Sequence, residues 1–221
     1  MHAENRWRLG YRRRARGHLF SGGVDDLSWL QPMELGGEHV VLQPLAADHR
    51  DALVAAAGDG ELWKLWFTGV PSAQNIDAYL DFALQEQELG RSLPFAVIHR
   101  ADGKVVGSTR FCNVEGPHRR AEIGYTWYGQ SYQRTPVNSE CKLLLLEHAF
   151  DQRDAVAVEF RTHCMNFKSR EAILRLGAKL DGVLRNHRIE GESFRDTAVY
   201  SIVRDEWPAV KMGLLAGLGR L

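Results

Sequence analysis

The sequence predicts an α/β domain, chiefly because residues 122–178 alternate two strand patterns with two helix patterns. That order places helix N-termini beside strand ends, where backbone amides can hold a phosphorylated cofactor. Two hairpin turns, Asp102-Gly103 and Glu190-Gly191-Glu192, add antiparallel strand pairs on either side of this unit. The chain is long enough to bury one core, so we expect a single domain with an extension.

Both strands of the unit show an alternating pattern, which predicts two distinct faces for each. In the strand expected over 121–128, one face carries Glu122, Gly124, Thr126 and Tyr128, and the other carries Ile123, Tyr125 and Trp127. In the strand expected over 157–163, Glu159, Arg161 and His163 share one face.

The two helices of the unit are marked by their ends. Asn138 and Ser139 are N-cap residue types and directly precede a run with an apolar stripe. The second helix is expected to open at Asn166 and to stop at Gly177, a residue type that favours helix C-termini.

The flanking elements follow from local signals for caps, turns and alternation. In chain order they are a strand over 38–45, a helix capped by Asp48 and running through Ala57, a helix opened by Pro71 and Ser72 and closed by Gly90, strands over 94–99 and 105–111, and a short terminal helix from Asp205 and Pro208.

At these residues the chain resembles the GNAT superfamily of acyl-CoA N-acyltransferases. Within it, the run from Asn166 and Ser169 to Leu176-Gly177-Ala178, followed by residues 182–187 and 195–201, resembles the branch of ribosomal-protein N-terminal-alanine acetyltransferases (RimJ/RimL-type). The resemblance covers roughly residues 35–207. It implies a mixed, mostly antiparallel central sheet with a splay between two central strands and helices on both faces.

This resemblance also implies a domain organisation and an activity. The acyltransferase domain would span 35–207, and residues 208–221 would form a helix packed on it. The implied reaction moves an acetyl group from acetyl-CoA to a primary amine, with a protein N-terminal α-amine as the leading acceptor. Two alternatives stay open: a small-molecule amine (polyamine, amino acid or amino-group toxin), and a non-catalytic CoA-binding module.

By the same resemblance, the amides of Thr126, Trp127 and Tyr128 hold the pantetheine and polarise the thioester carbonyl. Glu122 would accept the ammonium proton directly or through water. Its alternative role is a structural salt bridge on a strand.

The phosphate loop of the family contains glycines that this chain lacks. The aligned residues here are Gln133-Arg134-Thr135-Pro136-Val137-Asn138. Pro136 has no N–H to donate to a phosphate. Replacement donors would come from Arg134 and Thr135. The expected cofactor-binding residues are completed by Gln133, Val137, Asn138, Ser139, Asn166 and Ser169. An ordinary turn and helix cap is the alternative.

A second departure concerns the general acid. The family's tyrosine on this helix, which protonates the departing thiolate, aligns with Ile173. Ser169 is therefore a candidate donor to the sulfur, and an exposed serine near a helix start is the equally simple alternative.

Substrate residues are expected in an aromatic cluster, Trp63, Trp66 and Phe67, between the first two helices, where GNAT relatives shape the acceptor site. Core packing is the alternative for these rings. Arg195 could orient a peptide or pair with its neighbour Asp196.

The composition is consistent with a cytoplasmic enzyme, and the expectation for its assembly is a monomer or a homodimer. The chain has 221 residues, of which 44% are hydrophobic and 25% charged, and no apolar run long enough to cross a membrane. Three cysteines without metal-like spacing give no reason to expect a metal. No membrane partner is expected.

The first 20 residues contain six arginines and one glutamate. Residues 1–34 are therefore expected to form a basic, flexible extension peripheral to the enzyme. Such an arm could contact ribosomal RNA, but a solvated tail is the simpler expectation, and no other nucleic-acid partner is predicted.

Overall fold

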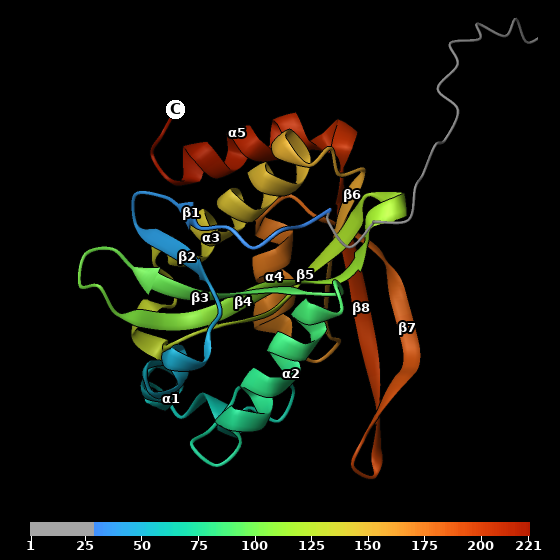
Figure 1. Ribbon diagram of the computed structural model, residues 1–221. Coiled ribbons are helices and arrows are strands. Elements are labelled where there is room, and N and C mark those ends of the chain that lie inside the picture. The colour runs from blue at the N-terminus through green and yellow to red at the C-terminus, as the bar shows by residue number, and fades with distance from the viewer. Residues whose placement is uncertain (1–28) are drawn as a thin grey trace, which may run out of the picture.

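The computed structural model describes residues 29–221, which fold around one eight-stranded sheet (Figure 1). The strand order is β1-β2-β3-β4-β5-β6-β8-β7, and every neighbouring pair is antiparallel except β5 and β6. The strands are β1 (Leu35–Gly36), β2 (Val40–Pro44), β3 (Leu93–His99), β4 (Val105–Glu115), β5 (Arg120–Tyr128), β6 (Ala157–His163), β7 (Lys179–Glu190) and β8 (Ser193–Val203).

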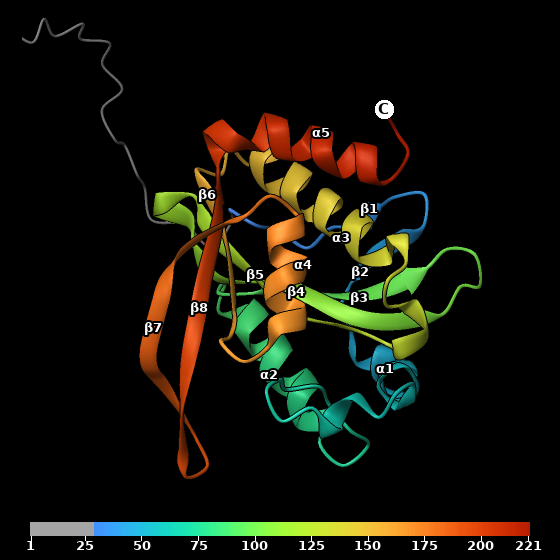
Figure 2. The ribbon, with the colours of Figure 1, turned by 180° about the vertical axis from the view of Figure 1, so that it is seen from behind.

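Helices cover both faces of the sheet (Figures 1 and 2). On one face lie α1 (Arg50–Gly58) and α2 (Ile76–Glu88), and on the other α3 (Pro136–Glu147), α4 (Phe167–Arg175) and α5 (Trp207–Gly217). Each face has its own apolar cluster, and Val210 and Leu214 of α5 are buried in the cluster that includes α3. The predicted fold, a mixed and mostly antiparallel sheet between two helical layers, is confirmed.

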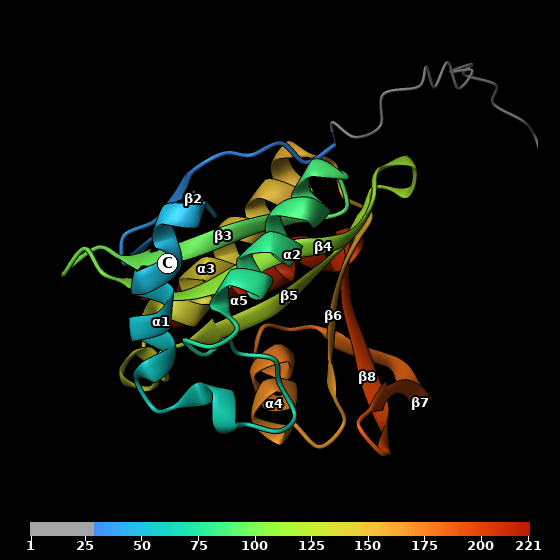
Figure 3. The same ribbon diagram turned by 60° about the horizontal axis from the view of Figure 1, so that its bottom comes forward.

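The predicted splay lies between β5 and β6, the two parallel strands. They pair at only three positions, ending with Glu122 opposite Glu159. Strand β6 pairs along its whole length with β8, from Ala157 opposite Val203 to His163 opposite Thr197. Because β6 stays paired with β8, it turns away from β5, and within the described part of the chain the second half of β5 has no strand partner on that side (Figure 3).

The predicted faces of β5 are wrong beyond Gly124, because the strand contains a bulge. Tyr125 adopts a φ of 50°, and two residues of β5 lie opposite the single Thr109 of β4. The extra residue reverses the alternation, so Thr126 and Tyr128 share a face with Ile123, and Trp127 shares the face of Glu122. Alternation alone gave no sign of this insertion.

Three helix starts differ from the sequence expectation. Helix α3 begins at Pro136 with Thr135 as its N-cap, so Asn138 and Ser139 lie within its first turn. Helix α2 begins at Ile76 rather than near Pro71, because residues from Ser72 form a turn in which Asn75 Oδ1 accepts from Ser72 N at 2.6 Å. Asp48 lies in a 3₁₀ turn before α1 and makes no capping hydrogen bond.

Within the segment 1–34 expected to be a flexible arm, Trp29 and Leu30 instead pack on the domain. Trp29 Nε1 donates to Arg153 O at 2.9 Å, and Arg153 Nε donates to Trp29 O at 2.5 Å. Leu30 is buried in the main apolar cluster. The arginines of the predicted arm lie outside the described residues.

This packing predicts that two truncations differ. Deleting residues 1–32 removes the buried Leu30 and the Trp29–Arg153 contact, and should lower the free energy of unfolding by ~2 kcal/mol and Tm by roughly 4–8 °C relative to a chain lacking only 1–28. Thermal denaturation of the two truncated chains checks this. Equal Tm values would show that Trp29 and Leu30 contribute nothing to stability.

Candidate active site

Glu122 lies where the sheet opens. It is in the last residue pair between β5 and β6, and only 8% of its surface is exposed. Its Oε2 accepts a hydrogen bond from Asn113 Nδ2 at 2.7 Å and lies 3.6 Å from Arg161 Nε. Gly124 leaves room for this carboxylate, because a Cβ there would lie 2.9 Å from Glu122 Oε1. The side chain is thus fixed from both neighbouring strands.

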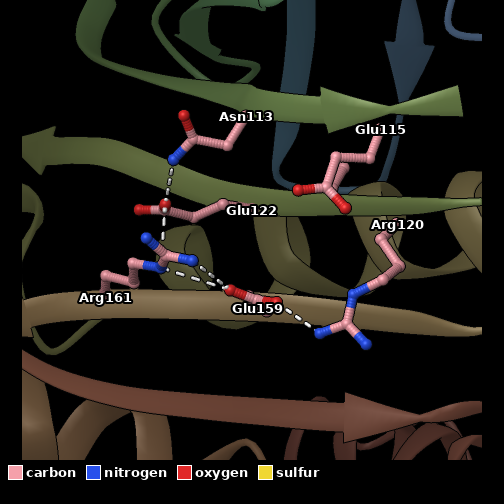
Figure 4. Close-up of a pocket in the computed structure, with 7 residues that line it drawn as sticks. Asn113, Glu115, Arg120, Glu122, Glu159 and Arg161 are labelled. Carbon is pink, nitrogen blue, oxygen red and sulfur yellow. Dashed lines mark hydrogen bonds and ion pairs between the residues drawn. The ribbon is translucent and has the colours of Figure 1, made fainter. Parts of the chain in front are cut away.

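A second carboxylate, Glu159, forms hydrogen bonds with the two arginines near Glu122. Arg161 donates to Glu159 Oε2 from Nε at 3.2 Å and from Nη2 at 2.8 Å, and Arg120 donates to Oε1. Figure 4 shows the resulting series of contacts from Asn113 through Glu122, Arg161 and Glu159 to Arg120. Arg161 is therefore closer to Glu159, at 2.8 Å, than to Glu122, at 3.6 Å.

The two carboxylates differ in proton affinity. Burial raises the pKa of Glu122 above its ordinary value, and the Asn113 hydrogen bond and the charge of Arg161 offset only part of that effect. Burial also acts on Glu159, but hydrogen bonds from Arg120 and Arg161 outweigh it and hold the pKa of Glu159 below its ordinary value. Glu122 is therefore the better proton acceptor, and Glu159 is an ion-pair partner.

Two hollows adjoin these carboxylates. The smaller, beside Glu122 and Asn113, has a volume of about 10 Å³, which is room for one water molecule. The larger has a volume of about 280 Å³ and is lined by Arg120, Glu159, Arg161, Asp181, Gly182, Leu184 and Val199. Its size approaches that of small-molecule sites, so it can receive an amine and the atoms next to it.

The free edge of β5 carries Thr126, Trp127 and Tyr128, the residues expected to bind the cofactor through their amides. Their other edge pairs with β4, as in Trp127 opposite Ser108. On the β6 side they have no strand partner among residues 29–221, so this edge can bind an extended ligand.

The side chain of Thr126 is held on the opposite face from Glu122. Its hydroxyl accepts from Lys142 Nζ of α3 at 2.7 Å and lies 2.8 Å from Thr109 Oγ1. Burial lowers the pKa of Lys142 to about 8. These contacts fasten the bulged part of β5 to β4 and α3, a role that no local pattern in the sequence indicated.

The loop from Gln133 to Asn138 forms a helix N-terminus without glycine. Gln133 Nε2 donates to Tyr128 O at 3.0 Å, Arg134 adopts a φ of 60°, and the Thr135 hydroxyl accepts from Val137 N at 3.4 Å. Pro136 is the first helical residue, where a missing N–H costs no intrahelical hydrogen bond.

Helical geometry decides which amides of this N-terminus remain free. Ser139 N–H is in position to donate to the Thr135 carbonyl, and Val137 N–H donates to the Thr135 hydroxyl, so the amide of Asn138 is the one that can face an anion. Arg134 is exposed next to this helix start. The loop therefore retains the elements of a phosphate site, with fewer amides than a glycine loop offers.

The second predicted helix start is confirmed as a cap. Asn166 Oδ1 accepts from Ser169 N at 3.1 Å, and Ser169 is half-buried in the first turn of α4. Ile173, at the position of the family's tyrosine, is buried in the apolar core. Ser169 lies about one helical turn before Ile173 on the same helix, which keeps it a candidate for the missing acid.

Of the predicted aromatic cluster, Trp66 and Phe67 are in contact with each other, and Trp66 also contacts the end of β6. Their ring centroids lie 5.5 Å apart, and the Trp66 ring lies 5.1 Å from that of His163. Trp63 is exposed in the same loop. This loop between α1 and α2 runs toward α4 (Figure 3), so it borders the opening of the sheet.

Arg195 is engaged differently from the sequence expectation. Its Nη1 pairs with Glu190 Oε1 at 3.0 Å, whereas Asp196 Oδ1 accepts from Asn186 N at 2.7 Å. The Arg195–Asp196 pair, which was one of the two alternatives, does not form, because consecutive residues of a strand point to opposite faces of the sheet.

Sequence reasoning missed Asn113 and Arg161, which hold Glu122 from β4 and β6. The alternation of β6 already placed Arg161 beside Glu159, and that was the available signal. Within residues 29–221, no cluster of three or more histidine, cysteine or acidic side chains could hold a metal ion. In the same part of the chain, no helix has both the length and the apolar character of a membrane span.

A family model described as the acetyltransferase (GNAT) domain matches residues 39–179. The chain belongs to this family. It is therefore an acyl-CoA-dependent N-acetyltransferase, and the opening between β5 and β6 lies inside the matched region. Its predicted membership of the GNAT superfamily is confirmed.

Relatives of this GNAT protein carry related names. The uncharacterized N-acetyltransferase YoaA of Bacillus subtilis (strain 168) is 24% identical over 171 residues, covering 76% of this chain and 94% of YoaA. YdaF of the same organism, provisionally named a ribosomal N-acetyltransferase, is 26% identical over 110 residues, covering 50% of this chain and 60% of YdaF.

Solved structures agree with the fold. A GCN5-related N-acetyltransferase from Brucella melitensis superposes with a TM-score of 0.76 at 30% identity, over 85% of this chain and 86% of that one. RimJ of Mycobacterium smegmatis, solved in complex with CoA-disulfide, superposes with a TM-score of 0.71 at 22% identity, over 86% and 96% of the two chains.

Proposed function

We propose that this GNAT enzyme acetylates a protein N-terminal α-amine, with Glu122 as the general base. The observation that carries the proposal is the buried Glu122, whose pKa is raised, at the point where β5 and β6 separate. An α-amine with a pKa of about 7.7–8 is largely protonated at neutral pH and must lose a proton before it can attack. Glu122 accepts that proton directly or through one water in the adjoining hollow.

The cofactor is acetyl-CoA, which supplies the activated acetyl group. The residues present fit it. The unpaired edge of β5 at Thr126, Trp127 and Tyr128 binds the pantetheine arm, and the N-terminus of α3 with Arg134 binds the phosphates. An amide on the bulged part of β5 stabilises the negative charge that develops on the carbonyl oxygen.

The leaving CoA thiolate requires a proton donor, and the side chain of Ile173 has no proton to give. Ser169 of α4 takes this role because it is half-buried at the start of the helix that begins just after β6. Gln133, Asn138, Ser139 and Asn166 shape the site by fixing the loop and the two helix starts. Trp63, Trp66, Phe67 and Arg195 border the acceptor.

The protein N-terminus is favoured as acceptor by the name of the relative YdaF and by the RimJ-like fold. A small amine is the second candidate, and the hollow of about 280 Å³ favours it because a compact molecule would occupy most of that volume. No separate observation favours a CoA-binding module without catalysis.

Acetyl transfer to a panel of amines tests the proposal. Release of CoA is measured with peptides beginning with alanine, with polyamines and with free amino acids, and mass spectrometry then locates the acetyl group. Acetylation of peptide α-amines with the highest kcat/KM supports the assignment. Binding of acetyl-CoA without turnover of any amine contradicts it.

The phosphate site gives a prediction of its own. Arg134→Ala should weaken CoA binding by about ten- to a hundredfold, because a charge-assisted contact to a phosphate is worth roughly 1.5–3 kcal/mol. Alanine keeps the same positive-φ penalty as arginine, so the backbone is little affected. Calorimetric titration with CoA measures the change, and an unchanged Kd would remove Arg134 from the site.

A further inference from the structure

A buried arginine outside the described catalytic contacts points to the acceptor's chemistry. Arg110 of β4 is 0% exposed, and its guanidinium lies over the rings of Tyr125 at 4.2 Å, Tyr79 at 5.0 Å and Phe82 at 6.0 Å. None of its three side-chain nitrogens has a hydrogen-bond partner among residues 29–221. The guanidinium therefore has aromatic neighbours but no hydrogen-bond partner among these residues, and its charge also acts on the carboxylate of Glu86 on α2.

Such a cage leaves the hydrogen-bonding capacity of the guanidinium unused. Aromatic rings interact with the cation through their faces, whereas the five N–H groups point outward in the plane of the guanidinium. A carboxylate binds in that plane through two parallel hydrogen bonds. Unpaired N–H groups are costly inside a protein, so a carboxylate that reached Arg110 would satisfy donors that the fold leaves open.

The rings on the solvent side of the cage are well placed to move. Tyr125 is 42% exposed and Phe82 is 44% exposed, and their ring centroids lie 6.2 Å apart. Tyr125 is also the bulge residue with a φ of 50°, an unfavourable conformation for a bulky side chain. Access to Arg110 requires a rotamer change at one of these rings, because its side chain is 0% exposed and both rings lie against its guanidinium.

Arg110 lies on the same face of the sheet as Glu122. Across β4 and β5, Arg110 pairs with Gly124 and Cys112 pairs with Glu122, so the two side chains are diagonal neighbours. Two cationic side chains lie near this spacing: Arg161, which is 3.6 Å from Glu122 but pairs more closely with Glu159, and Arg188, whose charge acts on both Glu122 and Tyr125. An acceptor with a carboxylate a few bonds from its amine could bridge this spacing.

We propose that Arg110 is the receptor for a carboxylate carried by the acceptor next to its reacting amine. This inference rests on the proposed function and narrows it. The acceptor is an anionic amine, either a chain whose first residue is aspartate or glutamate, or a free amino acid that presents its α-carboxylate. In both, Glu122 receives the proton of the amine while Arg110 fixes the acid group.

Matched acceptors test this with the unmodified enzyme. Peptides that begin with glutamate or glutamine, and free alanine or alaninamide, differ only in the presence of one carboxylate. We expect kcat/KM to be about ten- to a hundredfold higher for the acid of one pair, mostly through KM. The peptide pair reports a side-chain carboxylate, and the alanine pair reports an α-carboxylate. Turnover with no preference in either pair overturns the inference and leaves the acetyltransferase proposal standing.

Variants then assign the preference to Arg110. Arg110→Gln should reduce it to within about threefold, and Arg110→Lys should keep part of it, since lysine retains the charge but not the paired donors. Arg50→Gln, a surface arginine paired with Asp77, is the control for charge removal and should behave as the unmodified enzyme. Circular dichroism and Tm report whether the variants fold.

Persistence of the preference in folded Arg110→Gln overturns the role of Arg110. If that variant does not fold, the Lys variant and the matched acceptors still decide the matter. Failure of every acceptor to turn over removes the proposed function and this inference together.

Discussion

Replacing Glu122 with glutamine should lower kcat by roughly 10²- to 10⁴-fold while leaving the affinity for acetyl-CoA unchanged. Glutamine keeps the size of the side chain and can still meet Asn113, but it cannot accept a proton. Steady-state rates with the best amine, together with calorimetric titration of CoA, measure the two effects. Glu88→Gln, an exposed position on α2, is the matched control.

The pH dependence of kcat tests whether Glu122 is the general base. Burial raises the pKa of Glu122, so the unmodified enzyme should lose kcat as the pH falls through that raised value, because the protonated carboxyl is no longer a base. The limb should flatten in Glu122→Gln. Ser169→Ala should lower the rate more mildly and leave that limb in place. Full turnover of Glu122→Gln with an unchanged profile would reject the assignment and direct attention to Glu159.

Replacing Glu140 with glutamine should lower the free energy of unfolding by about 3–5 kcal/mol. Glu140 of α3 is 0% exposed, and its carboxylate accepts hydrogen bonds from the amides of Glu38, His39 and Val40 at 2.6–2.8 Å and from Arg220. Glutamine would turn an N–H₂ group toward these donors and leave Arg220 without its buried partner. Urea denaturation measures the loss.

A control exists on the same helix. Glu147→Gln removes a partly exposed partner of Lys211 and should cost less than about 1 kcal/mol. The pKa of Glu140 is lowered because its four hydrogen bonds outweigh burial, so its contribution is present above the ordinary pKa of a glutamate and is lost as the pH falls through the lowered value. The free energies of unfolding of the unmodified protein and of Glu140→Gln should therefore become equal in acid. A loss at neutral pH no larger than that of Glu147→Gln would contradict the proposed structural role.

The order of elements and the type of fold could be predicted because their signals are local. The alternation of β6 correctly separated Glu159 and Arg161 from the apolar Val158 and Phe160. The hairpin turn at Asp102-Gly103 joins β3 to β4 as expected, with Gly103 at a φ of 68°. The structure places Glu122, singled out by its place in the motif, where β5 and β6 separate.

Helix starts were predicted less well, because several residue types can cap a helix and only the packed structure selects among them. Thr135 caps α3 although Asn138 and Ser139 are stronger cap types, since Pro136 favours the first helical position. Asn166 caps α4 as expected, because its side-chain oxygen accepts from the amide of Ser169.

The sequence by itself determined which segments become strands and helices, their order, and the family motif that places a carboxylate where two neighbouring strands separate. Only the tertiary structure decided the bulge at Tyr125, the contacts of Glu122 with Asn113 and Arg161, and the aromatic cage of Arg110. The physical reason is the distance along the chain between the residues that interact. Periodicity and capping depend on residues within one or two turns of each other. Strand register and buried charge contacts depend on partners from separate elements, such as Glu140 and the amide of Val40, 100 residues apart, and these meet only when the chain folds.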